Sequence, residues 1–258
     1  MVKIILKKGR DESLRRFHPW VFSGAIAQIN GNPAEGDIVA VHSAQGEYLA
    51  AGHYQIGSIA VRILSFDSDP NSPEFWTDSI ARALQLRRSY GLYDNPRTNC
   101  FRLVHGEGDG LPGLIIDWYD GVCVMQAHSV GMFRSKAKIT QALRDVFGDE
   151  LKAVYDKSSG TAPFKAGLDL VDGYLYKSED EAARSHLGNR SRIEALIGAK
   201  SILERSPVLG KCRRVHYHQV IFSFGSFGEE FYGVFAIGVV VGVAAKRYIA
   251  VHKRHSPS

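Results

Sequence analysis

The N-terminal region concentrates basic and aromatic side chains in a short stretch of sequence. Two aromatic residues, Trp20 and Phe22, follow six basic residues that fall within twelve positions: Lys7, Lys8, Arg10, Arg15, Arg16 and His18. Cationic side chains bind phosphates and aromatic rings stack on unpaired bases, so this combination is typical of RNA recognition. We predict RNA-binding roles for the six basic residues and Trp20. The residue types alone are equally compatible with a solvated charged surface beside two core aromatic residues.

A second candidate site is a glycine-rich loop over residues 105–113, with the sequence HGEGDGLPG. Glycine permits positive φ and close backbone approach, so such a loop can present N–H groups to a phosphate or a nucleotide. Its two carboxylates, Glu107 and Asp109, argue against simple phosphate binding. The alternative is a structural turn in which both carboxylates cap local N–H groups.

The elements that must position the first candidate site are short strands. Turn signals separate the extended segments over the first 66 residues, with a loop at residues 30–33 and a short polar helix at residues 11–17. We predict strands at residues 2–7, 38–41, 48–54 and 58–66. Many short strands close together favour a small, partly closed β-barrel, which we assign to residues 1–70.

The second candidate site lies in a region that predicts a compact α+β domain over residues 71–178. Its first helix should begin with Ser72 as the cap and Pro73 in the first position, and Gly91 can end it. Asp120-Gly121 is a strong hairpin signal. We predict a second helix at residues 133–147 and strands at residues 101–105, 114–119, 122–128 and 151–155.

The composition changes near residue 180. Residues 1–180 carry 20 Lys and Arg against 22 Asp and Glu, a net charge of −2, whereas residues 181–258 carry 12 against 5, a net charge of +7. All 15 Asp residues lie before residue 181. We therefore treat residues 179–258 as a basic tail of uncertain fold, with a weak helix at residues 181–204.

The longest uncharged run and the cysteines indicate what class of protein this is. The uncharged run at residues 231–245 is shorter than a membrane span requires, so we expect no membrane partner. The three cysteines, Cys100, Cys123 and Cys212, form neither a metal pair nor a disulfide framework. We expect buried free thiols, no metal and a cytoplasmic location.

Four stretches of sequence resemble a known family. The stretches LKKGRDESLRRFHPWVFSGAI, EGDIVAVHSAQGEYLAAGHY and SIAVRILSF resemble a PUA domain, a small RNA-binding barrel. They are similar to the version found in bacterial large-subunit rRNA cytosine-5 methyltransferases, and FRLVHGEGDGLPGLIIDWYDGVCVMQ resembles the middle domain of that family. The resemblance covers about residues 3–175.

The resemblance implies a structured RNA partner, large-subunit rRNA, and S-adenosylmethionine as the cofactor of the intact family. It also implies attack of a Cys thiolate on the base, followed by methyl transfer and β-elimination. The loop that carries Glu107 and Asp109 should pack near the catalytic cleft. Lys157 stands where the family usually has an arginine facing the catalytic domain, although a solvated lysine is the alternative reading.

The donor-binding part of such an enzyme is not readable after residue 178. Neither FSFGSFGEE nor AIGVVVGVAA has the glycine spacing and the following acid that a donor site needs. Cys212 lies among basic residues that would lower its pKa, but its position does not fit the family. We expect that this chain binds no S-adenosylmethionine and that the tail is a remnant or frameshifted start of a Rossmann-like domain. The alternatives are a stand-alone RNA-binding protein and an unrelated protein whose basic tail recruits a partner.

The frameshift hypothesis can be tested on the gene. We expect that translation of the other two reading frames beyond codon 175 reveals a glycine-rich methyltransferase motif. The physical reason is that loss of Asp, the jump in charge and the end of the family pattern coincide there. Three frames without such a motif would end the hypothesis.

Overall fold

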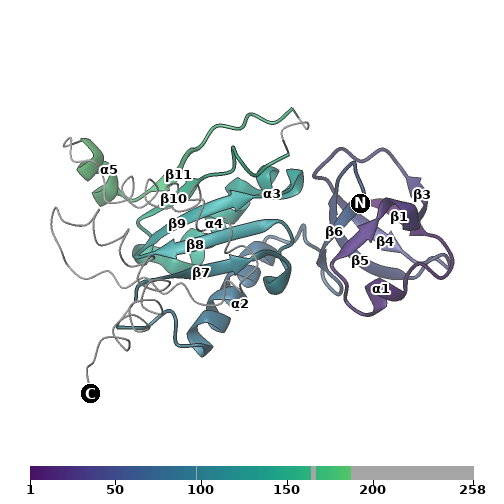
Figure 1. Cartoon of the computed structure of the whole chain (residues 1–258), viewed down its shortest axis with the longest axis horizontal. Helices are drawn as coiled ribbons and strands as arrows, with labels where there is room; N and C mark the ends of the chain where they lie inside the picture. Colours follow the sequence, from purple (N-terminus) through teal and green to yellow (C-terminus); the bar gives the residue numbers. More distant parts are fainter. Residues whose placement is uncertain (97, 164–166, 187–258) are drawn as a thin grey trace, which may run out of the picture.

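The computed structural model describes residues 1–96, 98–163 and 167–186. They form two lobes side by side, which we call the N-terminal lobe (residues 1–66) and the central lobe (residues 75–186) (Figure 1). Within these described residues, no helix combines the length and the apolar character needed to cross a membrane. The predicted run at residues 231–245, Cys212 and most of the basic tail lie outside them.

The N-terminal lobe is a strongly bent six-stranded sheet in the order β2-β6-β5-β4-β1-β3. β1 and β4 pair in parallel and the other neighbours are antiparallel. Alternate residues of each strand point inward, so that Val39 and Val41 are both fully buried. The elements are β1 (Val2–Leu6), α1 (Glu12–Arg15), β2 (Trp20–Phe22), the 3-10 turn η1 (Ser23–Ala25), β3 (Ile26–Asn30), β4 (Ile38–His42), β5 (Tyr48–Tyr54) and β6 (Ile59–Ser65).

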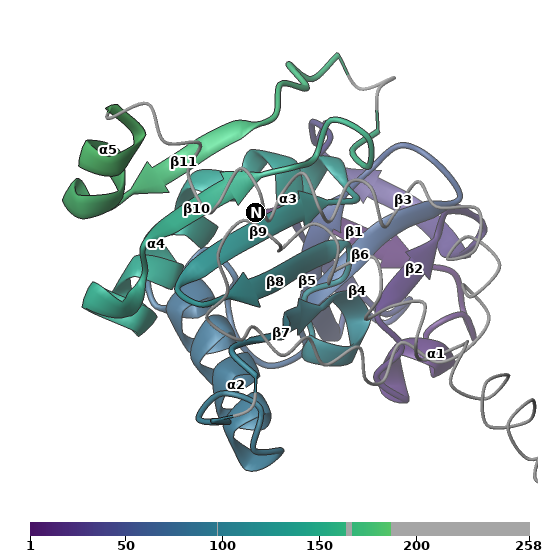
Figure 2. The same cartoon turned by 60° about the vertical axis from the view of Figure 1, so that its left-hand side comes forward.

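The central lobe is a five-stranded sheet in the order β11-β10-β9-β8-β7, and helices α2 and α4 share one core with it (Figure 2). β9 and β10 run parallel, whereas the other neighbours are antiparallel. The elements are α2 (Phe75–Ser89), β7 (Cys100–His105), η2 (Gly106–Asp109), β8 (Leu114–Tyr119), β9 (Val122–Ala127), α3 (Val130–Arg134), α4 (Lys136–Phe147), η3 (Gly148–Glu150), β10 (Ala153–Asp156), β11 (Gly173–Lys177) and α5 (Glu179–His186).

The α+β class with an N-terminal barrel-like sheet is confirmed, whereas several details differ from the sequence predictions. Ser72 does not cap α2, because its backbone forms a turn with Asp69 and the helix begins at Phe75. The helix predicted at residues 133–147 is two helices, α3 and α4, that meet at Ser135. Strands β2, β3 and β11 were not among the predicted strands. The hairpin at Asp120-Gly121 is present, and both of its residues adopt positive φ.

One contact joins the two lobes closely. His53 of β5 is 2% exposed and stacks on Trp76 of α2, with ring centroids 6.2 Å apart. Gly131 of α3 lies against the same imidazole, since a Cβ built there would come within 2.2 Å of His53 Cγ. The Ser135 hydroxyl is 3.4 Å from His53 Nε2. A glycine is therefore required at this position for α3 to approach the N-terminal lobe this closely.

Burial keeps the His53 imidazole neutral. Burial lowers the pKa of His53 from 6.5 to about 4, and the positive charges of Lys138 and Arg62 lower it further. The unfolded chain, by contrast, takes up a proton at this residue near pH 6.5. His53 therefore links protonation to the stability of the folded chain.

We predict that the free energy of unfolding falls as the pH drops from 6.5 to 4. Because the folded-state pKa of His53 is the lower one, its contribution is fully present above pH 6.5 and is lost below it, by about 3 kcal/mol in total. Denaturant unfolding across this pH range measures the effect. The variant His53→Gln, which cannot titrate, should show a shallower pH dependence than the natural chain. Equal slopes for the two proteins would contradict the prediction.

Candidate nucleic-acid interface

The basic and aromatic residues at positions 7–22 form what we call the N-terminal cluster. Its rings His18, Trp20 and Phe22 lie in a row on the outside of the barrel. In β2, Val21 is buried in the core, so its neighbours Trp20 and Phe22 both point outward. Trp20 contacts the His18 and Phe22 rings edge to face, at centroid distances of 5.6 and 6.3 Å. Phe22 is 49% exposed and the nearby Phe17 is 72% exposed. This row can present ring faces to a partner, whereas core aromatic residues cannot.

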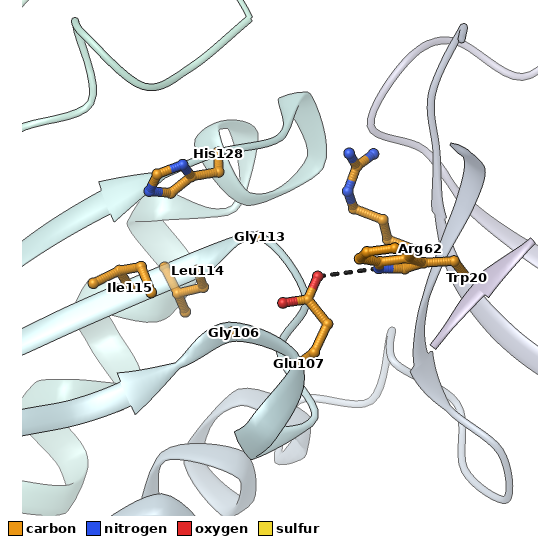
Figure 3. A pocket seen from close by; sticks show the side chains of 8 residues that line it. All are labelled: Trp20, Arg62, Gly106, Glu107, Gly113, Leu114, Ile115 and His128. Carbon is orange, nitrogen blue, oxygen red and sulfur yellow. Dashed lines mark hydrogen bonds between the residues drawn. The ribbon is translucent and has the colours of Figure 1, made fainter. Parts of the chain in front are cut away.

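The row leads into a pocket between the two lobes. The pocket has a volume of about 240 Å³, and Figure 3 shows its residues converging from both lobes. Two come from the N-terminal lobe and six from the central lobe: Trp20, Arg62, Gly106, Glu107, Gly113, Leu114, Ile115 and His128. The pocket therefore exists only when the lobes are docked.

Arg62 is a pocket residue that sequence reasoning missed. It lies in β6 directly opposite Trp20 of β2, which brings the two side chains together at the pocket. Its Nη1 donates a hydrogen bond to Gln55 Oε1 at 2.9 Å, which fixes the guanidinium. Burial lowers the pKa of Arg62, and the nearby Glu107 carboxylate opposes that shift. The strand pairing that places Arg62 could not be deduced from a single arginine in an apolar strand.

The two carboxylates of the glycine-rich loop have different environments. Trp20 Nε1 donates to Glu107 Oε1 at 3.0 Å, and this bond crosses the lobe boundary (Figure 3). Asp109 instead forms a bidentate ion pair with Arg87, and its side chain is only 3% exposed. Asp109 also accepts a hydrogen bond from the backbone N–H of His105. Asp109 therefore anchors the loop and does not line the pocket, whereas Glu107 does.

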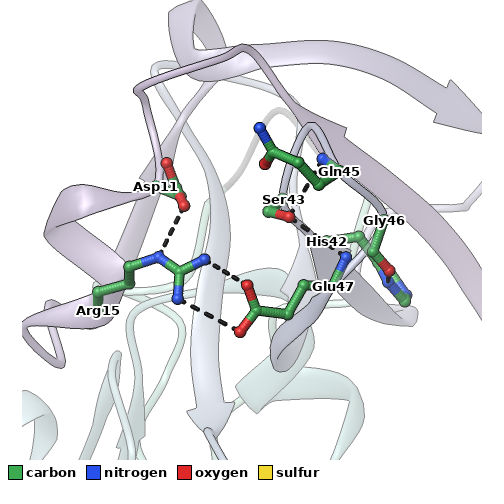
Figure 4. Close-up of polar contacts among 7 residues, drawn as sticks. All are labelled: Asp11, Arg15, His42, Ser43, Gln45, Gly46 and Glu47. Atoms are coloured by element: carbon green, nitrogen blue, oxygen red, sulfur yellow. Dashed lines mark hydrogen bonds and ion pairs between the residues drawn. The ribbon is translucent and has the colours of Figure 1, made fainter.

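The basic residues of the N-terminal cluster also fall into two groups. Arg15 donates to Asp11 Oδ2 at 2.8 Å and to Glu47 Oε2 at 2.5 Å (Figure 4). Hydrogen bonds from Arg15 lower the pKa of both carboxyl groups, and these carboxylates in turn raise the pKa of Arg15. Ser43 Oγ supports this arrangement, because it accepts the Glu47 backbone N–H at 3.2 Å. The Arg15 charge is thus already compensated.

The other predicted residues are less constrained. Lys7 Nζ donates to the Gly24 carbonyl at 2.9 Å but remains exposed. The imidazole Nδ1 of His18 accepts the backbone N–H of Trp20, which shapes the start of β2. Among the described residues, no ion pair involves the exposed side chains of Lys8, Arg10 and Arg16. The charges of these three cations are therefore not compensated by a carboxylate of the described residues.

Lys157 follows β10 and is not one of the residues that line the pocket. It is half-buried, and its backbone N–H donates to the Met125 carbonyl at 2.8 Å. The structure does not bring Lys157 to the pocket lining, so its predicted role toward a catalytic domain stays a prediction. Cys100 and Cys123 are buried free thiols, as expected.

Comparisons with known proteins agree with this architecture. Residues 4–66 match the family of PUA-like domains. "Ribosomal RNA large subunit methyltransferase I" of Alteromonas mediterranea is 39% identical over 176 residues, which are 67% of this chain and 43% of that protein. The protein of the same name from Pseudoalteromonas translucida is 36% identical over 193 residues, 74% of this chain and 48% of that protein. The chain thus spans less than half the length of these curated relatives.

Two solved structures share the fold. A Streptococcus mutans protein assigned as a SAM-dependent methyltransferase superimposes with a TM-score of 0.55 at 16% identity, over 69% of this chain and 44% of that one. A structure of an assigned methyltransferase in complex with SAH gives a TM-score of 0.56 at 16% identity, over 69% of this chain and 43% of that one. Identities this low show a common fold only. Residues 4–66 thus match a PUA-like domain, and over about two thirds of its length the chain is similar to bacterial large-subunit rRNA methyltransferases.

Proposed function

We propose that residues 1–178 bind structured RNA, as the RNA-binding part of an S-adenosylmethionine-dependent rRNA cytosine-5 methyltransferase. The proposed RNA is large-subunit rRNA, in keeping with the names of the relatives. The observation that carries this proposal is the row of outward-pointing rings in the N-terminal lobe, which lies close in sequence to exposed, uncompensated cations. The same row extends into the pocket between the lobes.

Local charge, and not net charge, must drive this binding. Residues 1–180 carry a net charge of −2, so the described lobes as a whole do not attract a polyanion. Lys8, Arg10 and Arg16 are exposed on one lobe, where phosphates can reach them. The exposed rings of Phe17 and Phe22 add stacking surface for bases that are not in a helix. The arrangement suits folded RNA with unpaired nucleotides better than a regular duplex.

The described residues do not suit the methyl-transfer step. Cytosine-5 methylation needs a Cys thiolate, but Cys123 is fully buried and burial raises the pKa of its thiol. Cys100 is 4% exposed. In the glycine-rich loop the Asp109 carboxylate is occupied by Arg87, so this loop does not fit the ribose-binding acid of a donor site. We therefore propose that the described lobes hold RNA and form no methyl-donor site of their own.

A stand-alone RNA-binding protein remains the second candidate function. It would use the same row of rings and the same cations, so RNA binding alone does not separate it from a part of an enzyme. Donor binding does separate the two functions, because only an assembled catalytic domain binds S-adenosylmethionine.

The contribution of the cations can be measured through the salt dependence of RNA binding. We expect Arg15→Ala plus Arg16→Ala to weaken binding of a structured rRNA fragment and to reduce the slope of log K against log salt by about one unit. The reduction in slope should come from Arg16. Arg15 is already paired with Asp11 and Glu47, so it does not neutralise a phosphate and does not release a counterion from the RNA.

Filter binding at several salt concentrations gives the slope for the double variant and for each single variant. Arg82→Ala, an exposed charge removal on α2 of the central lobe, serves as the matched control and should leave the slope unchanged. A slope that is the same in the natural chain and the double variant would remove the N-terminal cluster from the proposal.

Calorimetry tests the absence of donor binding. We expect titration of S-adenosylmethionine into the full chain to give no heat of binding, whereas titration of a structured rRNA fragment should give a saturable heat. The reason is that, among the described residues, no loop combines a glycine-rich turn with an acidic side chain that has no partner, and binding of S-adenosylmethionine needs both. A saturable heat with S-adenosylmethionine would contradict the proposal and favour a complete enzyme.

A further inference from the structure

We propose that the pocket between the lobes takes one unpaired nucleotide of the bound RNA, and that the Glu107 carboxylate recognises the exocyclic amino group of its base. This inference rests on the proposed RNA-binding function and adds a specific readout to it. None of the eight residues that line the pocket is a cysteine. We therefore assign the pocket a recognition role, separate from the methyl-transfer step.

The size of the pocket fits a single base. Its volume of about 240 Å³ lies below the range of roughly 300–1,000 Å³ that is usual for drug-sized ligands. A single ring system can enter a space of this size, whereas two stacked nucleotides cannot. The exposed ring of Phe22 contacts Trp20, which lines the pocket, so an RNA strand on the aromatic row can direct one base into the pocket.

The walls of the pocket supply the three kinds of contact that a nucleotide needs. The half-buried Ile115 supplies an apolar side chain, and the Trp20 indole offers a flat aromatic surface for the base (Figure 3). Arg62 from the N-terminal lobe and His128 from the central lobe approach from opposite sides (Figure 3). Both can donate hydrogen bonds to phosphate oxygens. An apolar side, a ring face and phosphate donors together describe a nucleotide better than a simple anion.

Glu107 supplies the specificity. Trp20 Nε1–H holds its Oε1 at 3.0 Å, and no donor among the described residues contacts its Oε2. An ionised carboxylate only accepts hydrogen bonds, so Oε2 can receive an amino N–H of cytosine, adenine or guanine. Uracil presents a carbonyl oxygen where cytosine has its amino group, and two acceptors repel. The pocket should therefore prefer cytosine to the isosteric uracil.

Trp20 provides a direct optical signal for entry of a base. The chain contains three tryptophans, and the other two, Trp76 and Trp118, are 4% and 5% exposed. A base in the pocket can stack on Trp20 but cannot reach the two buried indoles. Quenching of tryptophan fluorescence therefore reports on this pocket.

The experiment uses the full chain and hairpin RNAs that are identical except for one bulged nucleotide, which is cytosine, uracil or absent. At one fixed salt concentration, we expect the cytosine bulge to bind about tenfold more tightly than the uracil bulge and to quench the fluorescence. Glu107→Gln should reduce the preference to about twofold, because an amide can both donate and accept. Trp20→Phe should abolish the quenching.

Glu12→Gln is the matched control, since it removes one exposed carboxylate near the basic cluster but outside the pocket. It should keep the tenfold preference, and thermal unfolding should show that all variants fold. Free cytidine monophosphate carries the same base and phosphate as the bulged nucleotide. We expect it to cause no quenching at concentrations at which the bulged RNA saturates the protein. Quenching by the free nucleotide at those concentrations would overturn the assignment to an RNA-borne nucleotide.

The remaining outcomes separate this inference from the function on which it rests. If all three hairpins bind equally and with a normal salt dependence, RNA binding stands and the pocket assignment falls. The same holds if Glu107→Gln keeps the full tenfold preference. If no hairpin binds at any salt concentration, both proposals fall together.

Discussion

The packing of the His53 imidazole against Gly131 is a close contact between the two lobes. His53 fills the space that any side chain at residue 131 would need, and Trp76 covers its ring. Ring stacking of this kind contributes about 0.5–1.5 kcal/mol, while leaving His53 Nδ1 buried without a hydrogen bond costs about 1–3 kcal/mol. The contact is therefore held by close packing and burial. The Trp20–Glu107 hydrogen bond joins the same two lobes at the pocket.

Two arginine–carboxylate arrangements determine which charges and loops are available for binding. The buried pair of Arg87 and Asp109 ties the glycine-rich loop to α2, so that Glu107 projects toward the N-terminal lobe. Breaking one side of a buried pair is strongly destabilising, so this anchor is rigid. The exposed group around Arg15 instead neutralises a cation that would otherwise attract phosphate. In the proposed function, recognition is therefore left to the exposed cations, the rings and the interlobe pocket.

The parts of the fold that local sequence determines were predictable. The hairpin at Asp120-Gly121 needs positive φ at two positions, and the central strands β4, β5 and β6 follow apolar patterns with turn signals around them. The three missed strands, β2, β3 and β11, lie at the edges of their sheets, where they are largely half-buried or exposed. An edge strand forms because a neighbour offers hydrogen bonds, and a single sequence does not show that neighbour.

The sequence by itself determined that basic and aromatic residues gather at one end of the chain and that a glycine-rich loop carries two acids, because both features are local. Only the tertiary structure decided which of these side chains are engaged by other residues and which are available to a partner. Arg15 meets Glu47 across 32 residues, Arg87 meets Asp109 across 22, and Trp20 meets Glu107 across 87. Arg62 joins the pocket because β6 pairs with β2. Contacts between residues far apart in the chain depend on lobe docking and strand pairing, which no local spacing encodes.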